Sequence, residues 1–187
     1  TDDLPDERAV RALSFGGGKP PRRAVVAPVS SVIEVSLRHG DLAYARHAVL
    51  VGHYLGDTIV SAEAALDRRL HGALTRRRDL GLYPGASGSY AVFFNEGADA
   101  KPVGALVVGL GQVGELSPGQ LEIGVRDALL EYALQVIHRP DLRPPENPQP
   151  MGGPRRARAS CLLVGTGAGA LRVRDSIEAM LRGALAA

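Results

Sequence analysis

Two glycine-rich stretches of this 187-residue chain could bind phosphate, because glycine lets backbone N–H groups approach an anion closely. The first, V-V-G-L-G-Q-V-G-E-L at 107–116, contains the G-x-G-x-x-G spacing of dinucleotide-binding proteins. Its flanks contradict that function. The capping signal of the next helix, Ser117-Pro118, lies beyond the motif, and the acidic residue expected about 20 positions later at a strand end is missing. We therefore expect this stretch to form a strand-to-helix turn.

The second stretch follows an apolar run and enters a helix within a few residues, and it consists of Gly165, Thr166, Gly167, Ala168 and Gly169. Successive backbone N–H groups there could form an anion-binding concavity, to which the threonine adds a hydroxyl. The alternative is that the glycines only make a tight turn. Both interpretations stay open. If the chain binds a small ligand, we expect an anionic group on these amides.

No catalytic constellation is apparent. The five histidines have no metal-ligand spacing, and the single cysteine, Cys161, lies in an apolar run typical of the core. His53 lies at a strand end, where α/β proteins often carry chemistry, and a purely structural role is its alternative. We expect no catalytic residue, no metal and no cofactor.

Composition limits the partners. A net charge of +2 with 45% hydrophobic and 22% charged residues is typical of a globular protein without a strongly charged partner. Arginines cluster at 76–78 and 155–158, as solvated faces commonly do, which disfavours a nucleic-acid partner. The sequence has neither an apolar run of membrane length nor a signal peptide, so we expect no membrane association and a cytoplasmic location.

The apolar pattern alternates strands with helices, which predicts an α/β fold with a mixed sheet flanked by helices on both faces. Strands are expected at 23–28, 31–38, 48–54, 89–95, 105–108 and 159–164. The first helix follows Gly56-Asp57-Thr58 and should bury Ala62, Leu66, Leu70, Ala73 and Leu74, with Glu63 on its outer side. A second begins at Ser117 and should bury Leu121, Val125, Leu129 and Tyr132. The last should bury Val173, Ile177, Met180, Leu181 and Leu185.

Residues 1–22 are expected to be a loosely held lead-in, and residues 23–187 a single domain. A flexible loop rich in proline and arginine should interrupt this domain at about 139–158. Because the chain begins at Thr1 without methionine, we expect it to be part of a longer protein.

Several motifs resemble the amino-terminal domain of leucyl aminopeptidases. They are L-D-R-R-L-H-G-A-L at 66–74, L-Y-P-G-A-S-G-S-Y-A-V-F-F at 82–94 and G-A-L-V-V-G-L-G-Q-V-G-E-L-S-P-G-Q-L at 104–121. That domain is a relative of the macro domain, so the resemblance implies a macro-like fold. The run Y-L-G-D-T-I-V-S-A-E-A-A-L-D-R-R-L at 54–70 also resembles stretches of large bacterial proteins that carry a caspase-like CHAT protease domain elsewhere.

The segment V-G-T-G-A-G-A-L-R-V-R-D-S-I-E-A-M-L at 164–181 is similar to the macro phosphate loop, T-G-x-x-G, whose backbone amides hold a diphosphate. Thr166 and Gly167 match that pattern, whereas Gly169 arrives one residue early. The resemblance implies a nucleotide or an ADP-ribose-like ligand. Members that process ADP-ribose have an asparagine-rich strand end and a triple glycine, where this chain has G-H-Y-L-G-D-T at 52–58, so de-ADP-ribosylation is disfavoured.

Together these features predict a non-catalytic binding or regulatory domain of a larger multidomain protein, which binds a phosphate-bearing small molecule. One alternative is a hydrolase of the macro or aminopeptidase type that acts on ADP-ribose or peptides. Another is a structural assembly domain, which would have an exposed apolar patch and no ligand-sized pocket.

Overall fold

A computed structural model of the chain describes residues 32–97, 100–138, 157–167 and 171–187. The chain divides into two units, 1–32 and 33–187, and the second contains every helix and strand described below. The lead-in at 1–22, the expected strand at 23–28 and most of the expected loop at 139–158 lie outside the described residues, as do Ala168 and Gly169.

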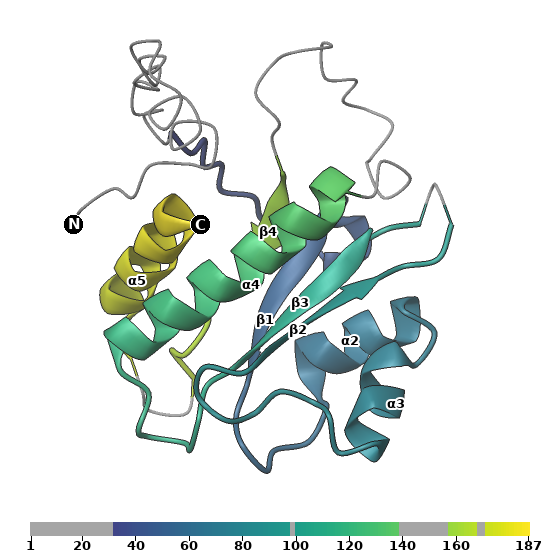
Figure 1. The fold of residues 1–187 in the computed structure, drawn as a ribbon, viewed down its shortest axis with the longest axis horizontal. Coiled ribbons are helices and arrows are strands. Elements are labelled where there is room, and N and C mark those ends of the chain that lie inside the picture. The colour runs from purple at the N-terminus through teal and green to yellow at the C-terminus, as the bar shows by residue number, and fades with distance from the viewer. Residues whose placement is uncertain (1–31, 98–99, 139–156, 168–170) are drawn as a thin grey trace, which may run out of the picture. The chain divides into compact units, whose positions relative to one another are not determined.

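Within the described residues a four-stranded sheet forms the centre of the second unit (Figure 1). Its strands lie in the order β2 (Tyr90–Phe94), β3 (Gly104–Gly109), β1 (Ala48–His53) and β4 (Ala159–Cys161). Strand β1 is parallel to both β3 and β4, whereas β2 runs antiparallel to β3. In register, Leu50 pairs with Leu106 on one side and with Cys161 on the other. The sheet is therefore mixed, as expected.

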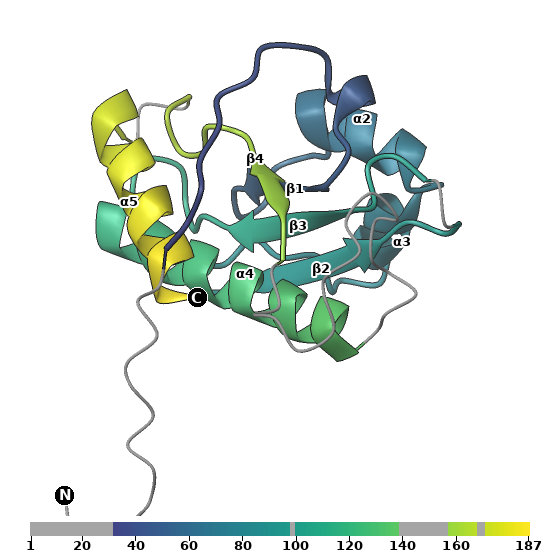
Figure 2. The same ribbon diagram turned by 90° about the horizontal axis from the view of Figure 1, so that it is seen from above.

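Helices cover both faces of this sheet (Figures 1 and 2). On one face lies α4 (Pro118–His138), with α5 (Val173–Ala186) packed against it, and on the other lie α2 (Ser61–Arg69) and α3 (Ala73–Asp79). A short 3₁₀ helix, η1 (Leu42–Tyr44), precedes β1. This arrangement confirms the expected α/β fold.

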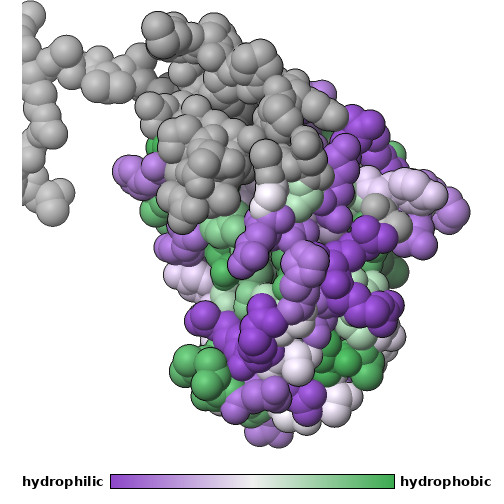
Figure 3. Space-filling model, turned by 90° about the vertical axis from the view of Figure 1, so that its right-hand side faces the viewer, coloured by the Kyte–Doolittle hydropathy of each residue, from purple (hydrophilic) through white to green (hydrophobic). Residues whose placement is uncertain are grey.

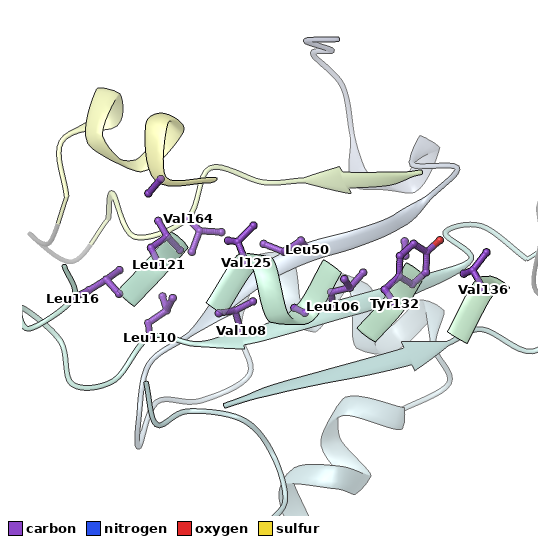
Figure 4. Packing of buried hydrophobic residues seen from close by; sticks show 13 residues of the cluster. Leu50, Leu106, Val108, Leu110, Leu116, Leu121, Val125, Tyr132, Val136 and Val164 are labelled. Carbon is purple, nitrogen blue, oxygen red and sulfur yellow. The ribbon is translucent and has the colours of Figure 1, made fainter. Parts of the chain in front are cut away.

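The two central strands are buried on both faces, which explains why their sequences are continuously apolar. Leu50, Leu106 and Val108 belong to the cluster under α4, together with its Leu121 and Val125 (Figure 4). The alternate residues of the same strands face α2 and α3, where Val49, Val51, Ala105 and Val107 pack with Leu66 and Leu74. Each central strand thus contributes to two separate cores.

Helix α4 begins where the capping signal predicts. The Ser117 Oγ accepts a hydrogen bond from the Gln120 N–H at 3.3 Å, and the Gln120 Oε1 accepts one from the Ser117 N–H at 2.8 Å. Gly124 then lets the helix lie close to β3, because a Cβ there would be 2.6 Å from a Val108 methyl carbon. The cap and the glycine together fix where α4 crosses the sheet.

The single helix expected after Thr58 is instead broken into α2 and α3. His71 and Gly72 adopt left-handed conformations, with φ of 53° and 78°, which end the first helix. The Asp67 carboxylate then accepts hydrogen bonds from the N–H groups of Leu74 and Thr75 at the start of α3. The apolar stripe correctly identified the buried face, but it carries no information about this break.

The strand expected at 31–38 was wrong. Residues 32–38 have no regular secondary structure, and Val35 and Leu37 are exposed. Alternation of apolar and polar residues predicts a strand only where a neighbouring strand and a core are present to receive it. None of the described strands pairs with this segment.

The buried face predicted for α5 was also wrong. This helix packs on α4 through its small residues Ser176, Ala179 and Gly183, and a Cβ at position 183 would lie 2.6 Å from the Glu122 carbonyl oxygen. The larger residues Val173, Ile177, Leu181 and Leu185 are exposed, and Met180 is partly buried. Close approach of the two helix backbones selects small side chains at the contact, which apolar periodicity does not reveal.

The packing of α4 predicts different effects for two leucines of this helix. Leu121 is fully buried whereas Leu130 is 39% exposed. Leu121→Ala should lower the free energy of unfolding by about 2–5 kcal/mol, because it leaves a cavity in the core. Leu130→Ala, the matched control, should lower it by less than about 1 kcal/mol. Urea unfolding measures both, and equal losses would contradict the assigned face.

Candidate functional site

The carboxyl ends of β1, β3 and β4 meet at one edge of the sheet, the edge at which ligands bind in open parallel sheets. The loops that follow β1 and β3 are joined by backbone hydrogen bonds. The Leu110 N–H donates to the His53 carbonyl and the Leu55 N–H donates to the Gly111 carbonyl, both at 2.9 Å. These hydrogen bonds hold the loop after β1 against the loop after β3.

The first glycine motif shapes a turn, as expected. Gly109 lies so close to the turn at 85–89 that a Cβ would be 2.2 Å from the Ala86 carbonyl oxygen. Gly111 and Gly114 have φ of 76° and 88°, which favour glycine. Helix α4 begins only at Pro118, so its free N–H groups lie past the motif.

The second glycine loop starts with Gly165, which has a φ of 79° and is packed so tightly that a Cβ would lie 2.7 Å from Leu116 Cδ2. The Leu171 N–H donates to the Gly165 carbonyl at 2.9 Å and closes the loop. Gly167 is exposed, with open space where a side chain would begin. Helix α5 begins at Val173, six positions past Gly167, so the loop enters the helix later than the sequence predicted.

Tyr54, the residue after β1, brings a polar group to the same edge. Its ring packs against the core cluster that contains Val164, and its hydroxyl is buried without a hydrogen-bond partner among the residues that the structure describes. Burial raises the pKa of Tyr54 above its ordinary value, so the hydroxyl stays protonated and can donate. Buried hydroxyl groups in proteins nearly always have a partner.

His53 ends β1 on the opposite face, where it forms a buried polar triad with Glu63 and Tyr83. The imidazole Nδ1 lies 3.0 Å from each Glu63 carboxylate oxygen, and the Tyr83 hydroxyl donates to Glu63 Oε1 at 2.8 Å. The His53 and Tyr83 rings meet edge to face, with centroids 4.8 Å apart. His53 and Glu63 are only 6% and 8% exposed. Burial and the adjacent Glu63 carboxylate raise the pKa of Tyr83 well above its ordinary value.

Sequence reasoning singled out His53 but missed both of its partners. Glu63 was expected on the outer side of its helix, which was wrong, because α2 turns this first-turn residue toward the end of β1. Tyr83 belongs to a stretch that was assigned only to a turn. No fixed spacing links the three residues. The signal in the sequence is weak: a polar residue, Glu63, lies beside the apolar stripe of its helix, and a histidine lies at a strand end.

Cys161 was expected in the core, but it lies on the edge strand β4 and is exposed. Nearby atoms nevertheless desolvate its sulfur and raise the pKa of the thiol to about 11. The reactive thiolate is therefore scarce near neutral pH.

The described surface has hollows at the end of β1 and beside α2. The smaller, about 180 Å³, lies at the end of β1 and is lined by His53, Leu55, Gly56, Asp57, Arg78, Gly81, Tyr83 and Gly85. The larger, about 340 Å³, is bounded by Asp41 and by three residues of α2, and it shares no residue with the strand ends. Hydrophilic side chains gather over α2 and α3 (Figure 3). The smaller hollow is the one with histidine and tyrosine side chains in its wall.

In the part of the chain that the structure describes, no three histidine, cysteine or carboxylate side chains gather in a way that could hold a metal ion. None of the described helices is long and apolar enough to cross a membrane.

The raised pKa of Tyr83 predicts a loss of stability at alkaline pH. Above about pH 10 the unfolded chain releases the phenolic proton while the folded chain keeps it, so stability falls by up to about 1.4 kcal/mol per pH unit for this group. In Tyr83→Phe the free energy of unfolding should decrease less steeply with pH. A change in stability that is the same at every pH does not affect this slope. Urea unfolding between about pH 9 and pH 11 measures the slope. An unchanged slope in the variant would show that Tyr83 ionises freely.

No protein-family model and no curated protein matches the sequence. Among solved structures, the fold is similar to the macrodomain of Mycobacterium tuberculosis DarG, with a TM-score of 0.55 over 78% of this chain and 86% of that chain. The two sequences are 14% identical, so this similarity establishes the fold alone. The chain has a mixed α/β fold of the macrodomain kind.

Proposed function

We propose that this chain is a non-catalytic, macrodomain-like binding domain that holds a diphosphate-bearing small molecule of the nucleotide or ADP-ribose class. The observation that carries the proposal is the glycine loop at 165–167, which follows the end of the parallel strand β4. Its Gly165 is buried against Leu116, whereas Gly167 is exposed in open space. The ligand's phosphates would lie on the amides of residues 165–169.

The described part of the loop has the features that an anion site needs. Gly165 turns the backbone through a left-handed conformation, and Gly167 leaves the loop surface free of side-chain atoms. Successive N–H groups in such a turn converge on a bound oxyanion. Thr166 is partly buried, and its hydroxyl would add a further donor.

The buried Tyr54 hydroxyl supports a ligand at this edge. A buried hydroxyl without a partner lowers stability by about 1–3 kcal/mol, and a ligand oxygen would recover that loss. Tyr54 packs on the same core cluster as Val164, the residue before the glycine loop. A ligand bound on the loop would also accept a hydrogen bond from this phenol.

The proposed role is binding rather than turnover. The strand end that processes ADP-ribose in macro domains is replaced here by Gly52-His53-Tyr54, and the hydrolase alternative would need another base and nucleophile. The domain would serve as a regulatory part of a larger cytoplasmic protein, with further domains of that protein as its partners. The aminopeptidase and CHAT resemblances are the sequence arguments for such a parent.

A specific observation favours the assembly alternative as a second function. Four large apolar residues of α5, spaced four apart, form an exposed row on the side away from the α4 contact, at positions 173, 177, 181 and 185. Such a row is typical of a helix that packs against a partner. Ligand binding and assembly are compatible, because the row and the glycine loop belong to different segments.

Two glycine substitutions test the binding site. Gly167→Val should abolish the binding of ADP-ribose, since a branched side chain would occupy the space of the phosphate oxygens. The fold should persist, because a Cβ at Gly167 meets no atom within 4 Å. Gly40→Val, also in open space and remote in sequence from the loop, is the control and should bind as the wild type does.

Calorimetry measures binding and circular dichroism verifies folding. Unchanged binding in folded Gly167→Val would reject the loop as the site. A wild-type protein that binds neither ADP-ribose, nor nucleotides, nor inorganic phosphate would leave assembly as the better function.

A further inference from the structure

The hollow at the end of β1 is separate from the glycine loop, and its wall has a specific chemical composition. Its polar side chains are His53, Asp57, Arg78 and Tyr83. Leu55 also lines it, and Leu80 and Leu82, which flank the lining residue Gly81, are exposed. A few convergent polar groups with an apolar rim are typical of a small-molecule site.

The hydrogen bonds of the triad determine which histidine atom is available. An ionised carboxylate accepts hydrogen bonds but donates none, so the contact with Glu63 places a proton on His53 Nδ1. Nε2 is then the ring nitrogen left for a ligand. The edge-to-face contact with Tyr83 holds the ring in place, so Glu63 and Tyr83 act as positioning residues.

The charged residues of the wall define the ligand further. Arg78, at the end of α3, supplies a guanidinium group that can form a bidentate contact with an oxyanion. Asp57 supplies a carboxylate whose Oδ1 accepts a hydrogen bond from the Thr58 N–H at 2.7 Å, and carboxylates also accept from ligand hydroxyl groups. The wall thus offers a cation, an anion and an imidazole. These groups suit a ligand that has one oxyanion for the cation and at least one hydroxyl group for the carboxylate.

We propose that this hollow is a second ligand site, which binds a small hydroxylated oxyanion. Arg78 pairs with the oxyanion, Asp57 accepts a hydrogen bond from a hydroxyl group, and His53 Nε2 forms the third contact. The volume of about 180 Å³ suits a ligand of a few carbon atoms, smaller than a dinucleotide. The oxyanion can be a phosphate monoester or a carboxylate, and the experiment below distinguishes the two.

The test uses two probes with the same three-carbon skeleton, glycerol 3-phosphate and glycerate, titrated into the full chain. Ring signals of the five histidines are followed by NMR, and His53→Gln assigns the signal of His53. A saturable shift of that signal by one probe is the expected result and identifies the oxyanion. An unmoved His53 signal with both probes would overturn the proposal.

Two arginine variants that remove the same charge distinguish a specific contact with the probe from general electrostatic attraction. Arg78→Gln should weaken binding of the effective probe about tenfold or more, as the loss of a charge-assisted contact does. Arg76→Gln, in the same helix but outside the wall, should bind within about twofold of wild type. Equal affinities of the two variants would overturn the proposal. Gly167→Val should leave this binding unchanged, so the outcome is independent of the glycine loop.

Discussion

Burial of β1 on both faces is the constraint on which the rest of this structure depends. Consecutive residues of a strand point to opposite sides, so a central strand must carry apolar side chains at every position. Where β1 ends, the same alternation sends His53 toward α2 and Tyr54 toward the core beneath α4. Two neighbouring residues thereby supply polar groups to two different places, the triad with its hollow and the edge beside the glycine loop.

Close backbone approaches keep these places in position. Gly52 within β1 lets Val164 and Leu110 come so near that a Cβ would lie 2.5 Å and 2.7 Å from their methyl carbons. Gly109 does the same for the turn that leads to β2. Gly52 and Gly109 thus serve packing, whereas Gly167 lies in open space and has room for a ligand. The motif with the more familiar spacing is structural, whereas the less regular one remains the candidate for binding.

The sequence allowed prediction of features that depend on local chemistry or on continuous burial. The apolar runs of β1 and β3 and the capping box at Ser117 were recognisable for this reason, and so was the mixed α/β class. Features set by tertiary contacts were not predictable. Glu63 is buried because His53 and Tyr83 receive it, and α5 turns its small residues inward because α4 lies close. The break at His71 depends on a carboxylate, that of Asp67, which caps α3 from the preceding helix. The residues proposed for the glycine site were predicted from the sequence, and ligand binding is the test of their role.

The central claim is that the ligand's phosphates lie on the glycine loop, and NMR mapping of the backbone amide and aromatic ring signals of the wild-type chain tests it most directly. On titration with ADP-ribose, the largest shifts should fall on the amides of Thr166 and Gly167 and on the Tyr54 ring. The His53 ring, on the other face of the sheet, should move little. Saturable shifts confined to other segments, or no shifts at all, would contradict the account.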